Sequence, residues 1–208
     1  MTHKLDLTFY LAGAIEANPD AKKGVEDWKE AIKLALAQPN IGIYDPVERE
    51  AQKTGKKSGE HVQYVTALKQ SGHWEQFHIE MHKIWWGMVK TARNAKVDLM
   101  IALRSRFLID GNEPRDLDYW GDIEAVIRSN FIVVYLPEKT RTIGTIREIT
   151  YAEMFTIPVY LILPDQTKTK ANSTLIDMVK TSGGETFYSV KECVTHIKET
   201  YKLDAKGE

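Results

Sequence analysis

The sequence predicts an α/β fold of the flavodoxin-like type, a doubly wound parallel sheet with helices on both faces. Short apolar runs rich in Val, Ile and Leu alternate along the chain with longer amphipathic segments. The short runs lack the polar alternation of a strand with one solvated face. Strands that are apolar on both sides are typical of parallel sheets covered by helices, and the alternating order indicates strand–helix–strand units.

The expected elements follow one another as strands and helices. Val25, Trp28, Ile32 and Leu36 recur at helical spacing and predict a helix over 25–37, which Pro39 ends. The expected strands are LTFYLAG at 7–13, IGIYDP at 41–46, KVDLMIAL at 96–103, FIVVYLP at 131–137 and PVYLIL at 158–163. Further helices are expected over 73–94, 117–130, 144–155, 173–181 and 189–201, with a short one near HVQYVTALK in the polar segment 51–72.

Length and composition limit the kind of protein. A chain of 208 residues with 43% hydrophobic and 27% charged residues is typical of one globular domain. The net charge of −1 and the scattered basic residues give no field that favours nucleic acid or a membrane surface. Cys193 is the only cysteine, which excludes an internal disulfide and a cysteine-built zinc site. With no signal-peptide pattern and no apolar run near about 18 residues, the expected location is the cytoplasm.

Glu148 is the first candidate for chemistry, and two interpretations compete for it. In doubly wound folds, ligands bind beyond the carboxyl ends of the strands, so a ligand site is expected at the loops 12–16, 45–50 and 138–148. Thr145-x-x-Glu148 has the spacing of a capping box, in which Glu148 bonds back to the cap's amide. A carboxylate in the first turn of a helix also interacts favourably with the helix dipole.

The reactive interpretation of Glu148 rests on its neighbours around the helix. At 100° per residue, Glu148 lies between Ala152 and Phe155, with Tyr151 on its other side. A carboxylate bordered by apolar groups at the end of a strand is partly desolvated, and such groups are frequent in active sites. Spacing alone leaves the structural and the reactive role open.

Two further residues raise the same alternative. Asp122 stands early in the helix that leads into 131–137, where an aspartate commonly serves as a partner of the helix dipole. Gly13 ends the first strand and permits either a tight turn or a close approach of backbone to a ligand. The chain contains neither a G-x-G-x-x-G nor a G-x-x-x-x-G-K-[ST] pattern, so dinucleotide and P-loop binding are unsupported.

His78 and His82 have an i, i+4 spacing that can hold zinc. The zinc-protease pattern requires its glutamate directly after the first histidine, whereas Glu80 comes one position later, and no third ligand is evident. We therefore expect no metal. The same helix carries an aromatic and methionine stripe that suits a core or a subunit contact: Trp74, Phe77, Met81, Ile84, Trp85 and Met88.

Three segments together resemble the nucleoside 2-deoxyribosyltransferase family, which includes deoxynucleoside-monophosphate N-glycosidases and phage-encoded members. These segments are FYLAGAIE at the start, DP after the second expected strand, and GDIEAVIRSNFIVVYLPEKTRTIGTIREITYAEMFTIPVYLI. Asp122 matches the family's helix aspartate, GTIREITYA matches its glutamate signature with Glu148, and Tyr10 matches the tyrosine near the nucleophile. Against the family pattern, Asn130 replaces an aspartate, and the segment of about 51–115 is an insertion in a single domain of residues 1–208.

The resemblance implies an enzyme that cleaves the N-glycosidic bond of 2′-deoxyribonucleosides through a glycosyl ester of Glu148. Asp122 would exchange a proton with the base or orient it, and Tyr10 would hold the Glu148 carboxylate. Further substrate-binding residues are then expected at Gly13, Asp45, Gly144, Arg147 and Tyr151. The partner is a small nucleoside or nucleotide, no cofactor is implied, and family members commonly form homo-oligomers.

Three other functions remain open at this point. A 5′-deoxynucleotide N-glycosidase would use the same chemistry with water as acceptor, and Arg141 or Arg147 could then bind the phosphate. A non-catalytic nucleotide-binding or sensing module is favoured by Asn130 and by Thr142 or Arg141, which stand near the place of the acidic residue that the family often has in the loop before its glutamate. A NAD-cleaving enzyme would also use a glutamate against a ribosyl carbon.

Overall fold

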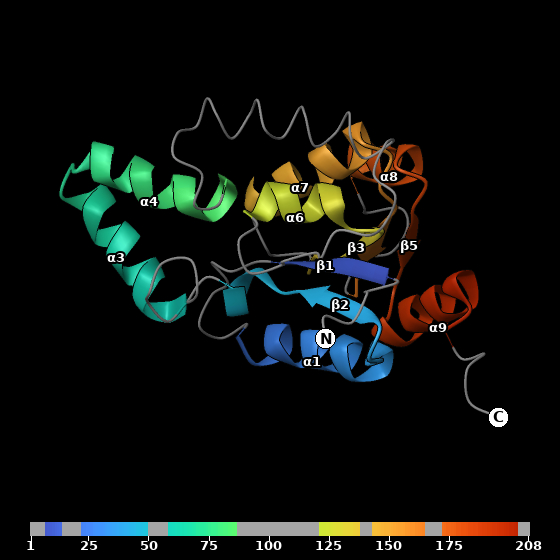
Figure 1. Ribbon diagram of the computed structural model, residues 1–208. Helices are drawn as coiled ribbons and strands as arrows, with labels where there is room; N and C mark the ends of the chain where they lie inside the picture. The colour runs from blue at the N-terminus through green and yellow to red at the C-terminus, as the bar shows by residue number, and fades with distance from the viewer. Residues whose placement is uncertain are drawn as a thin grey trace. The chain divides into compact units, whose positions relative to one another are not determined.

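The computed structural model describes residues 7–13, 22–49, 58–86, 121–137, 143–164 and 172–203 (Figure 1). Its strands are β1 (Leu7–Gly13), β2 (Ile41–Tyr44), β3 (Phe131–Tyr135), β4 (Val159–Ile162) and β5 (Glu185–Phe187). Its helices are α1 (Lys22–Leu36), α3 (Ser58–Gln70), α4 (Trp74–Trp86), α6 (Asp122–Arg128), α7 (Ile143–Met154), α8 (Ser173–Thr181) and α9 (Val190–Tyr201).

The chain divides into two compact units. The sheet unit comprises Leu5–Ile43 and Ser129–Glu208, and the helical unit comprises Met1–Lys4 and Tyr44–Arg128. The expected strand at 96–103 and the end of the expected helix over 73–94 lie outside the described residues.

The strands form one parallel sheet in the order β2-β1-β3-β4-β5. This is the strand order of flavodoxin-like folds, so the predicted fold class is confirmed. In the register of the two central strands, Tyr10 pairs with Ile132 and Gly13 with Tyr135, so that β1 and β3 end side by side. The carboxyl ends of these strands therefore form a common edge of the sheet.

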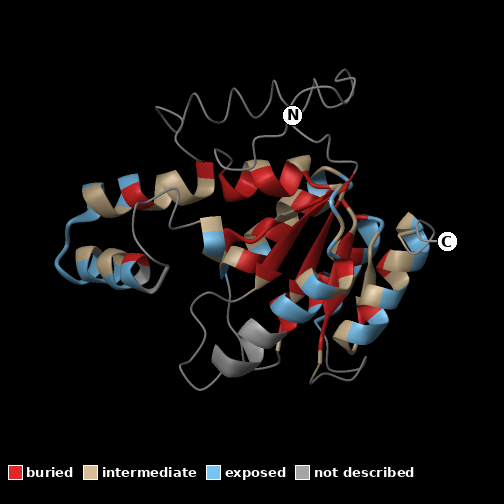
Figure 2. Ribbon diagram, turned by 60° about the horizontal axis from the view of Figure 1, so that its bottom comes forward, coloured by how far each residue is buried: buried red, intermediate tan, exposed pale blue. Residues whose placement is uncertain are grey.

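Helices of the sheet unit cover both faces of the sheet. Figure 1 shows α1 and α9 on one side of the strands and α7 and α8 on the other. Figure 2 shows that the strands are buried along almost their whole length, which explains their unbroken apolar composition. The face under α1 and α9 is packed by Leu7, Phe9, Leu11, Trp28, Ile32, Leu36, Phe131, Val133, Tyr160, Ile162, Phe187, Cys193 and Ile197.

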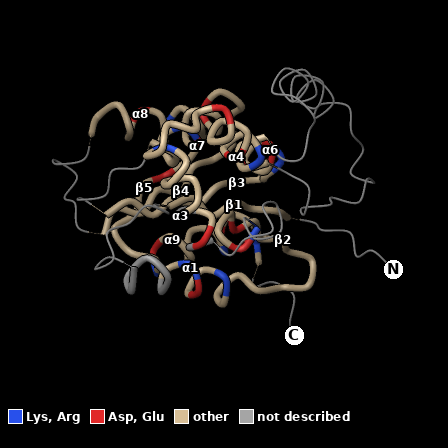
Figure 3. Tube along the Cα trace, turned by 90° about the vertical axis from the view of Figure 1, so that its left-hand side faces the viewer, with Lys and Arg blue, Asp and Glu red and all other residues tan. Residues whose placement is uncertain are grey.

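Cys193 lies within this core, on the side of α9 that faces the sheet. Its side chain is fully buried, and burial raises the pKa of the thiol well above its ordinary value. Figure 3 shows acidic and basic residues close together along the trace of α1, and Lys33 donates a hydrogen bond to Glu30 at 3.1 Å. Among the described residues, no helix is both long enough and apolar enough to cross a bilayer.

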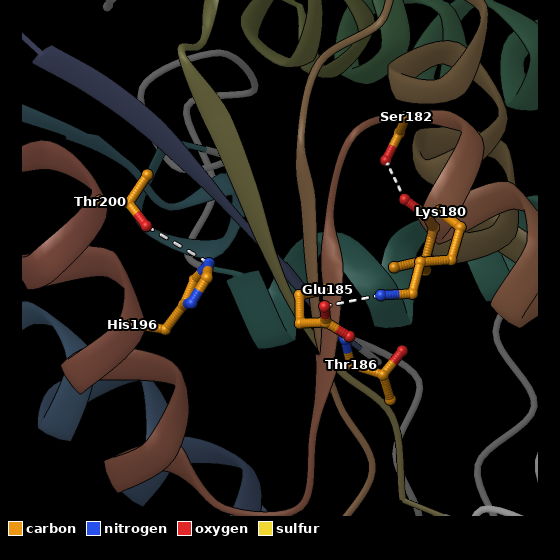
Figure 4. A network of polar contacts seen from close by, with 7 residues as sticks. Lys180, Ser182, Glu185, Thr186, His196 and Thr200 are labelled. Atoms are coloured by element: carbon orange, nitrogen blue, oxygen red, sulfur yellow. Dashed lines mark hydrogen bonds and ion pairs between the residues drawn. The ribbon is translucent and has the colours of Figure 1, made fainter.

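Strand β5 was not expected from the sequence, because it has only three residues and two of them are half-buried. Gly183 and Gly184 form the turn before it: Gly183 has a φ of +82°, and a Cβ on Gly184 would collide with the Val159 backbone. Figure 4 shows Lys180 of α8 reaching Glu185, with 2.6 Å between Nζ and Oε2. That hydrogen bond lowers the pKa of Glu185.

The helical unit contains the hairpin of α3 and α4, and α4 also packs against α6. Helix α3 is longer than the short helix expected near HVQYVTALK. Glu80 is buried in the hairpin and accepts hydrogen bonds from Gln76 at 3.0 Å and Lys83 at 2.9 Å. Burial opposes its ionisation, but these bonds and the charge of Lys83 lower the pKa of Glu80.

The aromatic stripe expected on α4 is only partly enclosed. Trp74 is 60% exposed, and the other described members are half-buried. Within the described part of the chain, the stripe is therefore an apolar face of α4 that remains partly accessible to solvent. Met88 lies outside the described residues.

Candidate active site

Glu148 lies on the side of α7 that packs on the sheet unit's core. The buried residues of α7 are Thr145, Glu148, Ile149 and Ala152, which recur at three- and four-residue intervals and form one stripe. Glu148 is 5% exposed although it carries a carboxylate. A carboxylate at this depth is rare unless a partner stabilises it, because burial disfavours the charged form.

The capping-box interpretation of Thr145-x-x-Glu148 is wrong. Helix α7 begins at Ile143, so Thr145 lies inside the helix and Glu148 lies beyond the first turn. An N-cap residue needs a non-helical backbone, which Thr145 does not have. The apolar spacing of the stripe, rather than the Thr-x-x-Glu pattern, determines where this side chain points.

Tyr10 and Glu148 meet across the interface of β1 and α7. The Tyr10 hydroxyl donates a hydrogen bond to Glu148 Oε1 at 2.6 Å, although the two residues are 138 positions apart in the chain. Tyr10 is fully buried, and strand alternation places it on the α7 face of the sheet. The short length is typical of a hydroxyl bonded to a carboxylate, the stronger class of hydrogen bond. The sheet thus holds a reactive type of side chain in a defined orientation.

Gly13 ends β1 with a close neighbour inside the sheet unit. A Cβ at this position would lie 3.0 Å from Cζ2 of Trp28 and 3.8 Å from the Tyr135 carbonyl oxygen. The Trp28 indole is itself buried and stacks on Tyr135 with 5.2 Å between ring centroids. The missing side chain therefore gives the indole room to pack over the ends of β1 and β3.

We expect Gly13→Ala to lower the free energy of unfolding by about 1–2 kcal/mol, because the added methyl group overpacks a rigid, stacked indole. Denaturant unfolding of the two proteins measures the difference. Gly13→Ala combined with Trp28→Phe removes the larger ring and should recover part of the loss. A variant with unchanged stability and a raised KM would instead assign Gly13 to substrate binding.

The remaining candidates of the sheet unit lie on α7. Gly144, Arg147 and Tyr151 are half-buried, on positions flanking the Glu148 stripe. Tyr151 stacks on Phe155 with 6.4 Å between ring centroids. Their positions near Glu148 follow from helix geometry, and their role in binding substrate stays a prediction.

Two predicted site residues belong to the helical unit, where each has an internal partner. Asp45 is buried and its Oδ1 accepts a hydrogen bond from the Val47 backbone amide at 3.1 Å, which caps the helical turn described over 46–49. Asp122 is 2% exposed and its Oδ1 accepts from the Tyr44 hydroxyl at 3.4 Å. Sequence reasoning missed Tyr44, which has the appearance of an ordinary buried aromatic at the end of a strand.

Asn130 has a structural task at the opposite edge of the sheet. Its backbone N–H donates a hydrogen bond to the Thr8 carbonyl oxygen at 2.7 Å, and its side-chain Oδ1 accepts one from the Thr8 backbone N–H at 2.8 Å. These two bonds join the amino ends of β1 and β3, whereas Gly13 and Tyr135 mark the carboxyl ends. Asn130 is therefore engaged in joining β1 to β3, at the end of the strands away from Gly13.

No group of three His, Cys, Asp or Glu residues is placed to hold a metal ion within the described ranges. His78 and His82 have ring centroids 6.2 Å apart, and His82 stacks on Trp86. Both ring contacts run along α4 itself, on which His78 is exposed and His82 is half-buried.

No protein-family model matches the sequence, and comparison with curated proteins gave no match. Among solved structures, the chain is similar to a conserved protein from Enterococcus faecalis V583. The TM-score is 0.51 at 18% identity, over 93% of this chain and 98% of that one. At this identity the similarity is one of fold.

Two other solved structures are similar over most of the chain. One is a 2-deoxyribosyltransferase from the psychrotolerant bacterium Bacillus psychrosaccharolyticus, with a TM-score of 0.46 and 12% identity over 89% of this chain and 88% of that one. The other is the CMP N-glycosidase BcmB of Clostridium botulinum, with a TM-score of 0.44 and 11% identity over 92% of this chain and 98% of that one.

Proposed function

We propose that the protein is a nucleoside 2-deoxyribosyltransferase-type enzyme with Glu148 as its nucleophile. The observation that carries the proposal is the 2.6 Å hydrogen bond from Tyr10 to a carboxylate on the core-facing side of α7. A carboxylate that served only as a partner of the helix dipole could remain at the surface of the helix, and it would need no hydrogen-bond donor from inside the sheet. The match of Tyr10, Asp122 and Glu148 to the family's motifs gives the same assignment from the sequence.

The proposed reaction has two displacements at the anomeric carbon. A Glu148 oxygen forms a bond to C1′ as the bond from C1′ to the base nitrogen breaks, and the electron pair leaves with the base. The departing nitrogen takes up a proton, for which Asp122 is the proposed source. A nitrogen of a second base then attacks C1′ while its proton passes back to Asp122, the ester bond breaks with its electron pair, and the Glu148 carboxylate is restored.

Tyr10 supports both displacements. Its hydroxyl bonds the charged form of the Glu148 carboxylate, which favours ionisation of the nucleophile and fixes its direction. The transition state has oxocarbenium character, so an oriented negative charge beside C1′ also stabilises it electrostatically. Water in place of the second base would make the same site an N-glycoside hydrolase.

Incubation of the protein with 2′-deoxyinosine and free adenine, followed by chromatography, tests the proposal. We expect 2′-deoxyadenosine and hypoxanthine to appear together. Free deoxyribose would identify a hydrolase, and 2′-deoxynucleoside 5′-monophosphates assayed in parallel would show whether the phosphate is required. Binding of these compounds without any turnover would identify a sensing module and exclude the proposed function. NAD in the same assay tests the remaining alternative.

A further inference from the structure

Strand β2 ends in a buried tyrosine whose hydroxyl meets the proposed proton donor. Tyr44 is fully buried and Asp122 is 2% exposed, and both belong to the helical unit. The Tyr44 hydroxyl lies 3.4 Å from Asp122 Oδ1, across 78 positions of sequence. This is long for a hydrogen bond between oxygens, as is common for catalytic contacts before substrate binds.

The Tyr44 hydroxyl can act only as a protonated group in this setting. Burial first, and then the negative charge of Asp122, raise the pKa of Tyr44 far above its ordinary value. Two other charged side chains act on it: Arg49 from the helix 46–49 opposes the increase, and Glu124 of α6 adds to it. Glu124 is itself bonded to Arg128 at 2.8 Å, which offsets part of its charge. The Tyr44 hydroxyl therefore stays protonated throughout the pH range in which enzymes ordinarily work.

A donor of this kind constrains the carboxylate in two ways. A hydrogen bond to one oxygen restricts rotation about the terminal torsion of Asp122, and it leaves the second oxygen for another partner. The same bond favours the charged form of the carboxylate over the protonated form. Tyr44 thus bears on the two properties that a proton-exchanging carboxylate needs, its direction and its affinity for the proton.

We propose that Tyr44 is a positioning residue that orients Asp122 and tunes its proton affinity for the exchange with the base. This inference rests on the proposed function for the reaction, whereas the coupling of Tyr44 to Asp122 stands on its own. Tyr44 touches neither sugar nor base in this scheme and acts through Asp122.

Tyr44→Phe removes the hydroxyl and keeps the ring, and Tyr160→Phe is its matched control. Tyr160 is also buried, at 3% exposure, and its hydroxyl lies 3.4 Å from the Tyr201 hydroxyl, a contact of the same length in the sheet unit. Carbon-13 NMR of protein labelled at the aspartate carboxyl groups follows the titration of Asp122 directly. The Asp122→Asn variant assigns the resonance by removing it.

We expect the titration midpoint of Asp122 to rise by about half a pH unit in Tyr44→Phe, since the lost bond favoured the charged form. Tyr160→Phe should leave the midpoint unchanged. In the transfer assay, Tyr44→Phe should lower kcat by about tenfold and change KM by less than about twofold, because the lost bond orients a proton-exchanging group. The limb of the pH profile that belongs to Asp122 should move in the same direction as the midpoint.

An unchanged midpoint, with equal loss of stability in Tyr44→Phe and Tyr160→Phe, would overturn the inference and leave Tyr44 as a space-filling residue. A raised midpoint in a protein that turns over no nucleoside supports the coupling and refutes the proposed reaction. The two failures are thus distinguishable.

Discussion

Glu148→Gln is expected to lower kcat for deoxyribosyl transfer by about 10³-fold or more, because it removes the proposed nucleophile. The substitution retains the size of the side chain, and the amide oxygen still accepts the hydrogen bond from Tyr10. The fold should therefore persist, with a far-UV circular dichroism spectrum like that of the unchanged protein. Chromatography of the transfer products measures the loss.

Glu153→Gln is the matched control for this substitution. Glu153 lies on the same helix, is half-buried, and projects away from the Glu148 stripe. It should retain near-normal kcat. Intact-mass spectrometry of quenched reactions adds a second readout: a deoxyribosyl adduct is expected on the unchanged protein and on Glu153→Gln, and not on Glu148→Gln. Near-normal transfer by Glu148→Gln would rule out the proposed mechanism.

Tyr10→Phe is expected to reduce kcat by about 10²-fold, since an unheld nucleophile is misdirected and less often ionised. The buried Glu148 Oε1 loses the donor at 2.6 Å, so the free energy of unfolding should also fall by about 1–3 kcal/mol. Loss of a bond to the charged form raises the pKa of a carboxylate. The acid limb of kcat/KM should consequently move to higher pH.

Tyr160→Phe separates this effect from the loss of any buried hydroxyl in the sheet unit. Its contact with Tyr201 lies on the α1 and α9 face of the sheet, away from α7. We expect this variant to keep the pH profile of the unchanged protein, even where its stability drops. If Tyr10→Phe lost stability and retained full activity, the bond to Glu148 would be structural only.

The fold class could be predicted because its signal is repeated along the chain. Runs such as 131–137 are apolar at every position, which only a strand covered on both faces requires. Strand β5 could not be predicted in this way, because three residues are too few to show a period. In the sequence, only the Gly183–Gly184 pair precedes it as a turn signal. Gly184 lies against the Val159 backbone, and no local sequence pattern reveals that contact.

The candidate site was predictable by residue type and only partly by geometry. The Thr145-x-x-Glu148 pattern indicated a cap, but a four-residue match is weaker than the apolar stripe that sets the rotation of α7. The contact of Tyr10 with Glu148 was expected through a family resemblance, since spacing alone cannot bring together residues so far apart. Tyr44 was missed because a buried tyrosine shows its donor role only when its acceptor is known.

Cys193 is a natural probe for the rate at which the sheet unit opens. A thiol-specific dye can reach this fully buried sulfur only after α9 separates from the strands beneath it. No other cysteine competes for the dye, since the chain contains one. The labelling rate therefore reports how often this face of the sheet opens, without any engineered probe. A nucleoside that slows the labelling would show that an occupied site stabilises the sheet unit against opening.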